Sequence, residues 1–247
     1  MTRRIAIVQA RVGSGRLPAK VLADLGGTTM LGHVLRRLQQ ARSLDAVVVA
    51  APWGPADDVL GPVCAQHQVE LVRGPGDDVL GRYLLAARAA HADVIVRVTA
   101  DCPLLDPEVV ERVVAALTDD VDYASNTHRR TFPRGLDVEA LHRDTLERVG
   151  RLATTAAHRE HVTALLLDEP ALFRIAQVVA PISADDLRWT VDTPEDLAVV
   201  RRLIAELDLG RRVPPYAEVV GHVRANPGLA AGNAAIVQKP WSQADVG

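Results

Sequence analysis

The segment Ile5–Val21, IAIVQARVGSGRLPAKV, decides how the rest of the chain is interpreted. Residues 5–10 form an almost continuous apolar run, which is typical of a strand buried on both faces of a sheet. A loop with two glycines and three cations follows directly: Gly13 and Gly15, with Arg11, Arg16 and Lys20. Because open parallel sheets bind ligands at the carboxyl ends of their strands, this loop indicates an anion site that would suit a polyphosphate.

Neither standard phosphate motif describes this loop. A P-loop needs a glycine before its lysine and a hydroxyl residue after it, whereas Ala19 precedes Lys20 and Val21 follows it. The dinucleotide fingerprint needs a third glycine where Pro18 stands. Composition alone therefore explains the loop equally well as a solvated surface loop or as a phosphate site.

Apolar, β-branched runs alternate with helical patterns over the first half of the chain. Strands are predicted over residues 5–10, 46–51, 70–73 and 94–99. Helices are predicted over residues 30–41, 55–66, 77–90 and 107–117. This order predicts an α/β fold with a mainly parallel sheet and right-handed crossovers.

The second half of the chain has a different rhythm. Strands are predicted over residues 121–126, 135–141, 173–179 and 187–191. Helices are predicted over residues 142–152, 157–167, 193–206 and 215–225. Thr193 is the expected N-cap of the third of these helices, because Pro194 follows it at the first helical position. We expect one domain over residues 1–226 and a loose C-terminal tail over 227–247, which contains Lys239.

Charge and composition argue against several classes of protein. The 247-residue chain has a formal net charge of −3 and 3% aromatic residues, so no nucleic-acid partner is expected. The two cysteines, Cys64 and Cys102, lie in different segments, which argues against a disulfide framework or a zinc site. No apolar run reaches transmembrane length. We therefore expect a cytoplasmic protein that has no membrane partner.

Two aspartates stand where predicted strands end. Asp101 lies in TADCPLLDP and Asp192 in RWTVDTPEDL. Either carboxylate could simply cap a turn or a helix. Mg²⁺, however, takes few protein oxygens and completes its shell with substrate phosphates. Together with the cationic loop, the two aspartates suggest a site for a metal ion and a triphosphate.

Six segments, in order over most of residues 4–205, make the chain resemble a known family: IVQARVGSGRLPAKVL, RGPGDDVLGRY, VRVTADCPLLDP, FPRGLDVEAL, REHVT and VDTPEDL. They resemble the cytidylyltransferases of the spore coat polysaccharide biosynthesis protein F type, which are related to the synthetases of CMP-Kdo and CMP-sialic acid. The resemblance implies a Rossmann-like nucleotide-diphospho-sugar transferase fold with a mixed, seven-stranded sheet, and often a homodimer. It also implies transfer of CMP from CTP to an oxygen nucleophile, with Mg²⁺ as cofactor and release of pyrophosphate.

The resemblance also implies roles for single residues. The nucleotide-binding residues would be Ala10, Arg11, Gly13, Ser14, Arg16, Lys20, Arg73 and Asp101, with Arg11, Lys20 and Asp101 also catalytic. Asp101 and Asp192 would be the Mg²⁺ ligands. The acceptor-binding candidates are Arg129 and Arg134 from the basic segment NTHRRTFPRG, together with Asp137, Glu139, Arg159 and His161. Ala19 departs from the family pattern, because a glycine is common before the lysine.

The identity of the acceptor stays open in the sequence. A sugar acid is the first interpretation, and a small phosphonate or phosphate from natural-product biosynthesis is the alternative. A dianionic acceptor would suit the segment NTHRRTFPRG, although a solvated basic loop is the simpler interpretation of this segment. The chain could also be a nucleotide-binding domain without catalytic activity instead of an enzyme. The presence of Arg11, Lys20, Asp101 and Asp192 argues against that alternative.

Overall fold

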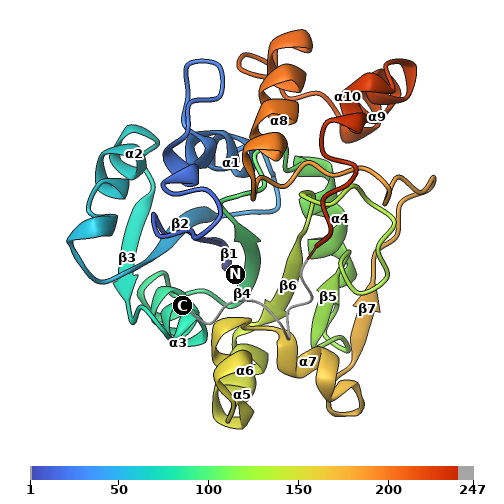
Figure 1. Ribbon diagram of the computed structural model, residues 1–247. Coiled ribbons are helices and arrows are strands. Elements are labelled where there is room, and N and C mark those ends of the chain that lie inside the picture. Colours follow the sequence, from blue (N-terminus) through green and yellow to red (C-terminus); the bar gives the residue numbers. More distant parts are fainter. Residues whose placement is uncertain (1, 239–247) are drawn as a thin grey trace.

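The structure is a computed structural model that describes residues 2–238. These residues form one seven-stranded sheet with the order β3-β2-β1-β4-β6-β5-β7 (Figure 1). The strands are β1 (Arg4–Gln9), β2 (Ala46–Pro52), β3 (Glu70–Gly74), β4 (Val94–Thr99), β5 (Tyr123–Ser125), β6 (Glu139–His142) and β7 (Ile175–Gln177). Strand β6 pairs antiparallel with both of its neighbours, while every other pairing is parallel. The predicted mixed, mostly parallel α/β sheet is confirmed.

Helices cover both faces of this sheet. The longer ones are α1 (Met30–Leu38), α3 (Val79–Ala89), α4 (Pro107–Ala116), α5 (Arg143–Leu152), α8 (Pro194–Glu206) and α9 (Tyr216–Ala225). The shorter ones are α2 (Leu60–Gln66), α6 (Ala156–Glu160), α7 (Ala164–Asp168) and α10 (Gly228–Ala231), with 3₁₀ turns η1 (Lys20–Leu22), η2 (Pro55–Asp57) and η3 (Pro170–Leu172). In Figure 1, α1 and α8 lie above the sheet, and α3, α5 and α6 lie below it.

The core has two layers because successive strand residues point to opposite faces. On β1, Ala6 and Val8 pack in the layer with α1, α4 and α8, whereas Ile5 and Ile7 pack in the layer with α3 and α5. All four residues have no exposed surface. The apolar run at the start of the chain is therefore the centre of the sheet, and the loop after it emerges at the carboxyl edge.

Several predicted elements differ from the structure. The predicted helix over 55–66 is the turn η2 followed by α2, and the predicted strand over 173–179 shortens to β7. Residues 187–191 do not form a strand of the sheet: Val191 N donates to Asp101 O, and Trp189 N donates to Arg134 O. The segment thus bonds to two loops and makes only an isolated bridge at Arg188. The predicted helix over 157–167 is two helices, α6 and α7, because the buried Val162 between them takes a left-handed φ of 45°. The predicted strand over 135–141 shortens to β6, which begins at residue 139.

Part of the segment 227–247, which is predicted to be a loose tail, lies among the described residues. Helix α10 lies in this region, and the side chain of Leu229 in it is 2% exposed. Asn233 is 3% exposed. Leu229 and Asn233 therefore pack against the domain, whereas many of the other residues in 228–238 are exposed. Lys239 lies outside the described residues.

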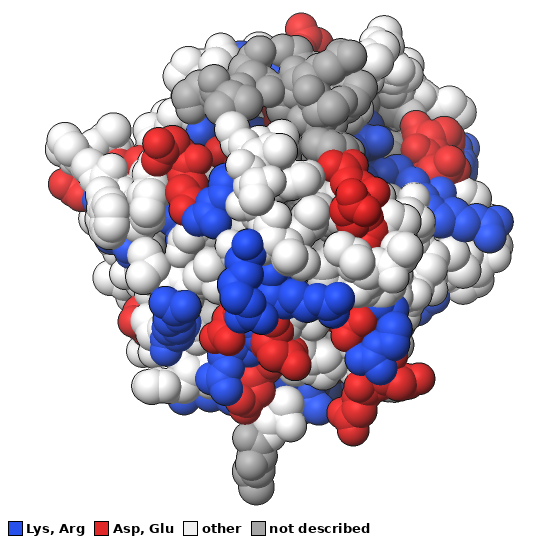
Figure 2. All heavy atoms as spheres, turned by 90° about the horizontal axis from the view of Figure 1, so that it is seen from below, with Lys and Arg blue, Asp and Glu red and all other residues white. Residues whose placement is uncertain are grey.

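The surface carries charges of both signs. Figure 2, the view from below Figure 1, shows basic and acidic side chains interspersed over this face. A face of mixed sign offers a polyanion no continuous basic surface. Among residues 2–238, no helix is long and apolar enough to cross a membrane.

Candidate active site

The loop after β1 turns back over the carboxyl edge of the sheet and brings Lys20 to it. Ala19 N donates to Val12 O at 3.0 Å, and Val12 N donates to Asp57 Oδ1 at 2.7 Å. Ala19 has a left-handed φ of 55°, directly before the turn η1 that begins at Lys20. That backbone conformation is easiest for glycine, so Ala19 adopts it at a cost that a glycine would not incur.

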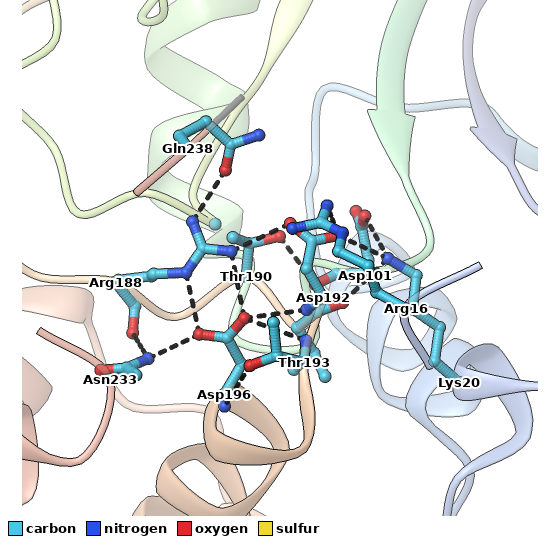
Figure 3. A network of polar contacts seen from close by, with 12 residues as sticks. Arg16, Lys20, Asp101, Arg188, Thr190, Asp192, Thr193, Asp196, Asn233 and Gln238 are labelled. Atoms are coloured by element: carbon cyan, nitrogen blue, oxygen red, sulfur yellow. Dashed lines mark hydrogen bonds and ion pairs between the residues drawn. The ribbon is translucent and has the colours of Figure 1, made fainter. Parts of the chain in front are cut away.

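Lys20 lies between the two aspartates that the sequence singles out (Figure 3). Its Nζ donates to Asp101 Oδ2 at 2.9 Å and to Asp192 Oδ1 at 2.8 Å. It also donates to Val191 O at 2.9 Å. Burial acts to lower the pKa of Lys20, but the adjacent Asp101 and Asp192 outweigh it and raise this pKa above its ordinary value. The two carboxylates therefore converge on one point, and an ammonium group occupies it.

Asp101 is held by its own strand end. Thr99 Oγ1 donates to Asp101 Oδ1 at 2.6 Å, and the Cys102 thiol lies 3.6 Å from the same oxygen. Burial acts to raise the pKa of Asp101, but the charge of Lys20 and the bond from Thr99 lower it to about 2. The backbone carbonyl of Asp101 accepts bonds from Val191 N at 2.9 Å and from Thr190 Oγ1 at 3.3 Å. Hydrogen bonds therefore hold the loop that carries Asp192 against the loop that carries Asp101.

Cationic side chains contact both carboxylate oxygens of Asp192. Its Oδ1 binds Lys20 and lies 3.2 Å from Arg16 Nη2. Its Oδ2 accepts a bond from Arg188 Nη2 at 2.9 Å. The Asp192 side chain is 11% exposed, whereas the Arg16 side chain is 39% exposed. Arg16 is therefore free to meet a ligand at the surface while it stays beside the carboxylates.

The donor set suits a divalent cation shared with a ligand. Among the described residues, no group of three or more His, Cys, Asp or Glu side chains could enclose a metal ion. Asp101 and Asp192 alone offer two converging carboxylate oxygens, within hydrogen-bond distance of the same Lys20 nitrogen. Mg²⁺ is commonly bound in proteins by one or two carboxylates, with phosphate oxygens and waters as its other ligands.

The two glycines of the loop stand in open surroundings. A Cβ built on Gly13 or on Gly15 meets nothing within 4 Å. Backbone N–H groups in such an open, cationic loop can approach phosphate oxygens closely. Ser14 lies between the two glycines and is half-buried. Ala10 is 1% exposed, and its N–H donates to Ala50 O at 3.2 Å.

A cavity of about 200 Å³ lies next to Asp101. Its lining residues are Arg97, Val98, Thr99, Thr127, Asp137, Glu139, His161, Thr163, Ala164 and Leu167. Thr99 connects the two places, because it lines the cavity and donates to the Asp101 carboxylate. Of the acceptor-side candidates, the structure brings Asp137, Glu139 and His161 together here.

A buried ion pair forms one wall of this cavity. Arg97 Nη1 donates to Glu139 Oε2, and Glu139 Oε1 accepts bonds from Tyr123 and, at 2.7 Å, from Thr163 Oγ1. Burial acts to lower the pKa of Arg97, but Glu139 raises it above its ordinary value. Arg97 Nε has no hydrogen-bond partner among the described residues, and Arg97 Nη2 reaches Gln9 Oε1 only at 3.5 Å. Glu139 is thus saturated, whereas Arg97 has donors to spare.

The other predicted arginines lie apart from the cluster around Lys20. Arg11 Nη2 lies 3.8 Å from Glu160 on α6. Arg73 binds Asp58 and, at 2.9 Å, Gly54 O beyond the ends of β2 and β3.

The remaining acceptor-side arginines do not line the cavity next to Asp101. Arg159 binds Asp78, the N-cap of α3. The backbone of Arg129 bonds with Gln177, and Arg134 lines a different cavity of about 190 Å³ beside Trp189.

Several residues of the site were missed by the sequence reasoning. Arg97 carried a signal, since it is a lone charge inside the apolar strand VIVRVT and needs a buried partner. Arg188 and Asp196 are separated by eight residues and bond through space, and Asn233 joins them from near the C-terminus. Spacing in the sequence indicates nothing of that association.

Comparison with known proteins agrees with this geometry. Residues 5–207 match the family model described as cytidylyltransferase. The chain is 33% identical over 205 residues to the spore coat polysaccharide biosynthesis protein SpsF of Bacillus subtilis, covering 80% of this chain and 84% of that protein. It is 32% identical over 251 positions to a 3-deoxy-manno-octulosonate cytidylyltransferase of Anaeromyxobacter sp., covering 82% of this chain and 98% of that protein.

A solved structure extends the likeness to the fold. A cytidylyltransferase from Leptospira borgpetersenii superposes with a TM-score of 0.89 at 28% identity. The superposition covers 96% of this chain and 100% of that one. The expected resemblance is confirmed over both sequence and fold: this chain belongs to the cytidylyltransferase family and is a nucleotidyltransferase.

Proposed function

We propose that this protein transfers CMP from CTP to a small acid in a Mg²⁺-dependent reaction that releases pyrophosphate. The observation that carries the proposal is the convergence of Asp101 and Asp192 on Lys20, a cation of the glycine-containing loop after β1. Displacement at a phosphorus atom needs positioning and neutralisation of charge more than covalent help from the protein. The cations Lys20 and Arg16 supply neutralisation of charge, and the paired carboxylates of Asp101 and Asp192 supply a fixed position for a metal ion.

Asp101 and Asp192 would hold Mg²⁺, which neutralises phosphate oxygens when it is bound. Lys20 and Arg16 would then face the triphosphate rather than the carboxylates alone. Their fixed positive charge stabilises the charge that develops on the departing pyrophosphate. Thr99 keeps the Asp101 carboxylate turned toward the cluster through its bond at 2.6 Å.

The acceptor would enter the cavity next to Asp101, and its lining favours an acid with one negative charge and several hydroxyl groups. Arg97 lines the cavity and supplies a positive charge beside which a carboxylate could bind, and Thr99 and Thr127 offer hydroxyl groups. Asp137 and Glu139 also line the cavity, but Arg130 pairs with the first and Arg97 with the second, so these pairs leave no net positive charge to hold a dianion. A sugar acid therefore suits this lining better than a phosphonate or phosphate does.

The test is pyrophosphate release from CTP with a panel of acceptors and a titration of Mg²⁺. We expect turnover with sugar acids such as Kdo or sialate, none without Mg²⁺, and little with small phosphonates. Turnover with phosphonates and with no sugar acid would show that the acceptor is a phosphonate and not a sugar acid. Mg²⁺-dependent CTP binding without turnover, across the whole panel, would mean a non-catalytic nucleotide-binding domain.

The matched variants are Asp101→Asn and Asp186→Asn. Asp101→Asn keeps the shape of the side chain but removes its charge, so we expect turnover to fall by roughly 100-fold or more. Asp186 pairs with Arg224 at 2.6 Å, and its side chain is 58% exposed. Asp186→Asn should leave turnover unchanged. Equal rates in the two variants would remove Asp101 from the mechanism.

A further inference from the structure

We infer that residues 228–238, here called the C-terminal clamp, hold Asp192 in place through Arg188 and Asp196. The inference rests on the proposed function only in treating Asp192 as a ligand of Mg²⁺. The family model matches residues 5–207, so the clamp lies beyond the matched part of the chain. Figure 3 shows Asp192 with Lys20 and Arg16 on one side, and with Arg188, Asn233 and Gln238 on the other.

Asp196 is the centre of the network. Its side chain has no exposed surface, yet its carboxylate accepts five hydrogen bonds. Two of them come from the backbone N–H groups of Asp192 and Thr193, at 3.0 and 3.2 Å. The backbone that carries Asp192 is thus tied to a fully buried carboxylate.

Arg188 ties the Asp192 side chain to the same centre. Its Nη2 donates to Asp192 Oδ2 at 2.9 Å and to Asp196 Oδ2 at 3.0 Å, and its Nε donates to Asp196 Oδ1 at 2.8 Å. The Arg188 side chain is 8% exposed. Because one buried guanidinium serves both carboxylates, a displacement of Arg188 would also displace Asp192.

The clamp supplies the remaining partners. Asn233 Nδ2 donates to Asp196 Oδ1 at 2.8 Å and to Arg188 O at 3.0 Å. Gln238 Oε1 accepts a bond from Arg188 Nη1 at 2.7 Å. These contacts need a close approach to α8, since a Cβ at Gly232 would lie 2.8 Å from Val199 Cγ2.

Loss of the clamp contacts would leave buried charges short of partners. Asp196 would lose one of its five donors, and Arg188 would lose the acceptor of Nη1. Partly satisfied buried networks lose their fixed geometry. Mutation of the groups that orient metal ligands commonly costs about 10- to 100-fold in metal affinity or activity. Asn233 and Gln238 are therefore positioning residues for Asp192.

The first test uses the protein without CTP or metal. Amide exchange measured by NMR should be roughly 10-fold faster at Asp192 and Thr193 in Asn233→Leu than in the wild type, while β1 amides stay unchanged. Gln238 is half-buried at the edge of the network, so Gln238→Leu is the variant to use if Asn233→Leu does not fold. Gln238→Glu keeps an acceptor for Arg188 and should restore slow exchange.

The second test measures the Mg²⁺ dependence of turnover. In Gln238→Leu or Asn233→Leu, the half-saturating Mg²⁺ concentration should rise roughly 10-fold, while KM for CTP at saturating Mg²⁺ changes by less than about 2-fold. Arg224→Ala is the control. Arg224 lies on helix α9, and its substitution removes an exposed ion pair with Asp186. It should change neither quantity.

The two readouts separate the inference from the function on which it rests. Unchanged amide exchange at Asp192 and Thr193 in both Leu variants would overturn the clamp. Faster exchange with an unchanged Mg²⁺ requirement would overturn its role in positioning the metal ligand. Absence of turnover in the wild type would instead refute the proposed activity, and amide exchange would still decide whether the clamp holds the Asp192 loop.

Discussion

At the scale of single residues, Lys20 is the most informative side chain. Its ammonium group lies 2.9 Å from Asp101 and 2.8 Å from Asp192, where a divalent cation would also be attracted. Without bound nucleotide, Lys20 holds the two neighbouring carboxylates close to each other. The same side chain can serve the triphosphate when Mg²⁺ takes over the carboxylates.

In Lys20→Met, Asp101 and Asp192 lose the cation between them, so Mg²⁺ binding should stabilise the variant more than the wild type. We expect CTP turnover to fall by roughly 100- to 1,000-fold, and Mg²⁺ alone to raise Tm more in this variant than in the wild type. Arg42→Met is the control: Arg42 is exposed after α1, beside the amino ends of the strands, so its loss should change neither quantity. An equal Mg²⁺ effect on Tm in Lys20→Met and in the wild type would contradict a metal site at Asp101 and Asp192.

At the scale of elements, the segment 187–192 shows how loops rather than strands build the site. Val191 N donates to Asp101 O, while Trp189 and Thr190 donate to Arg134 O. Gly135 makes this approach possible, because its φ is +106° and a Cβ there would lie 2.4 Å from Thr190 N. The periodicity of residues 187–191 resembles that of a strand, yet the partners of this segment are the two loops.

Gly135→Ala should disrupt this junction. The added methyl group meets backbone atoms and the φ is unfavourable, so we expect a loss of about 2 kcal/mol or more in the free energy of unfolding. Gly221→Ala is the matched control in helix α9, where a Cβ meets nothing within 4 Å. It should leave stability unchanged or raise it by about 0.5–1 kcal/mol. Urea denaturation measures both, and similar losses would contradict the close approach at Gly135.

At the scale of the whole molecule, a polar side chain inside the core makes stability depend on pH. His33 on α1 has no exposed surface, and its Nε2 lies 2.7 Å from Leu25 O. Because a carbonyl oxygen only accepts, Nε2–H donates a hydrogen bond to it. Burial lowers the pKa of His33 to about 4, although the bond to Leu25 opposes the shift. Above the ordinary pKa of about 6.5, folded and unfolded chains are both neutral here.

Below that pH, the unfolded chain takes up a proton at His33 that the folded chain does not, so folding stability falls as the pH drops from 6.5 toward 4. The loss from this one group should be about 2 kcal/mol between pH 7 and pH 5. His33→Gln can keep the donor but does not titrate, so its unfolding free energy should fall less over this range. Parallel losses in the wild type and the variant, measured by urea denaturation, would refute the effect.

The sequence by itself determined the α/β order, the central strand 5–10 and the cationic loop after it. Those features follow from local periodicity and from the rule that parallel sheets bind ligands at one edge. The loop, Asp101 and Asp192 were placed together on that rule, and the structure shows Lys20 in contact with both aspartates.

Only the tertiary structure decided which charges are partners. Arg97 bonds with Glu139, which is 42 residues away in the sequence, and Asn233 bonds with Asp196, which is 37 residues away and also binds Arg188. Burial selects such partners, because a charge removed from water needs a counter-charge wherever the fold brings one. For the same reason the residues after 227 looked loose in the sequence: their polar side chains Asn233 and Gln238 meet Asp196 and Arg188 only when α8 and the C-terminal segment are folded together.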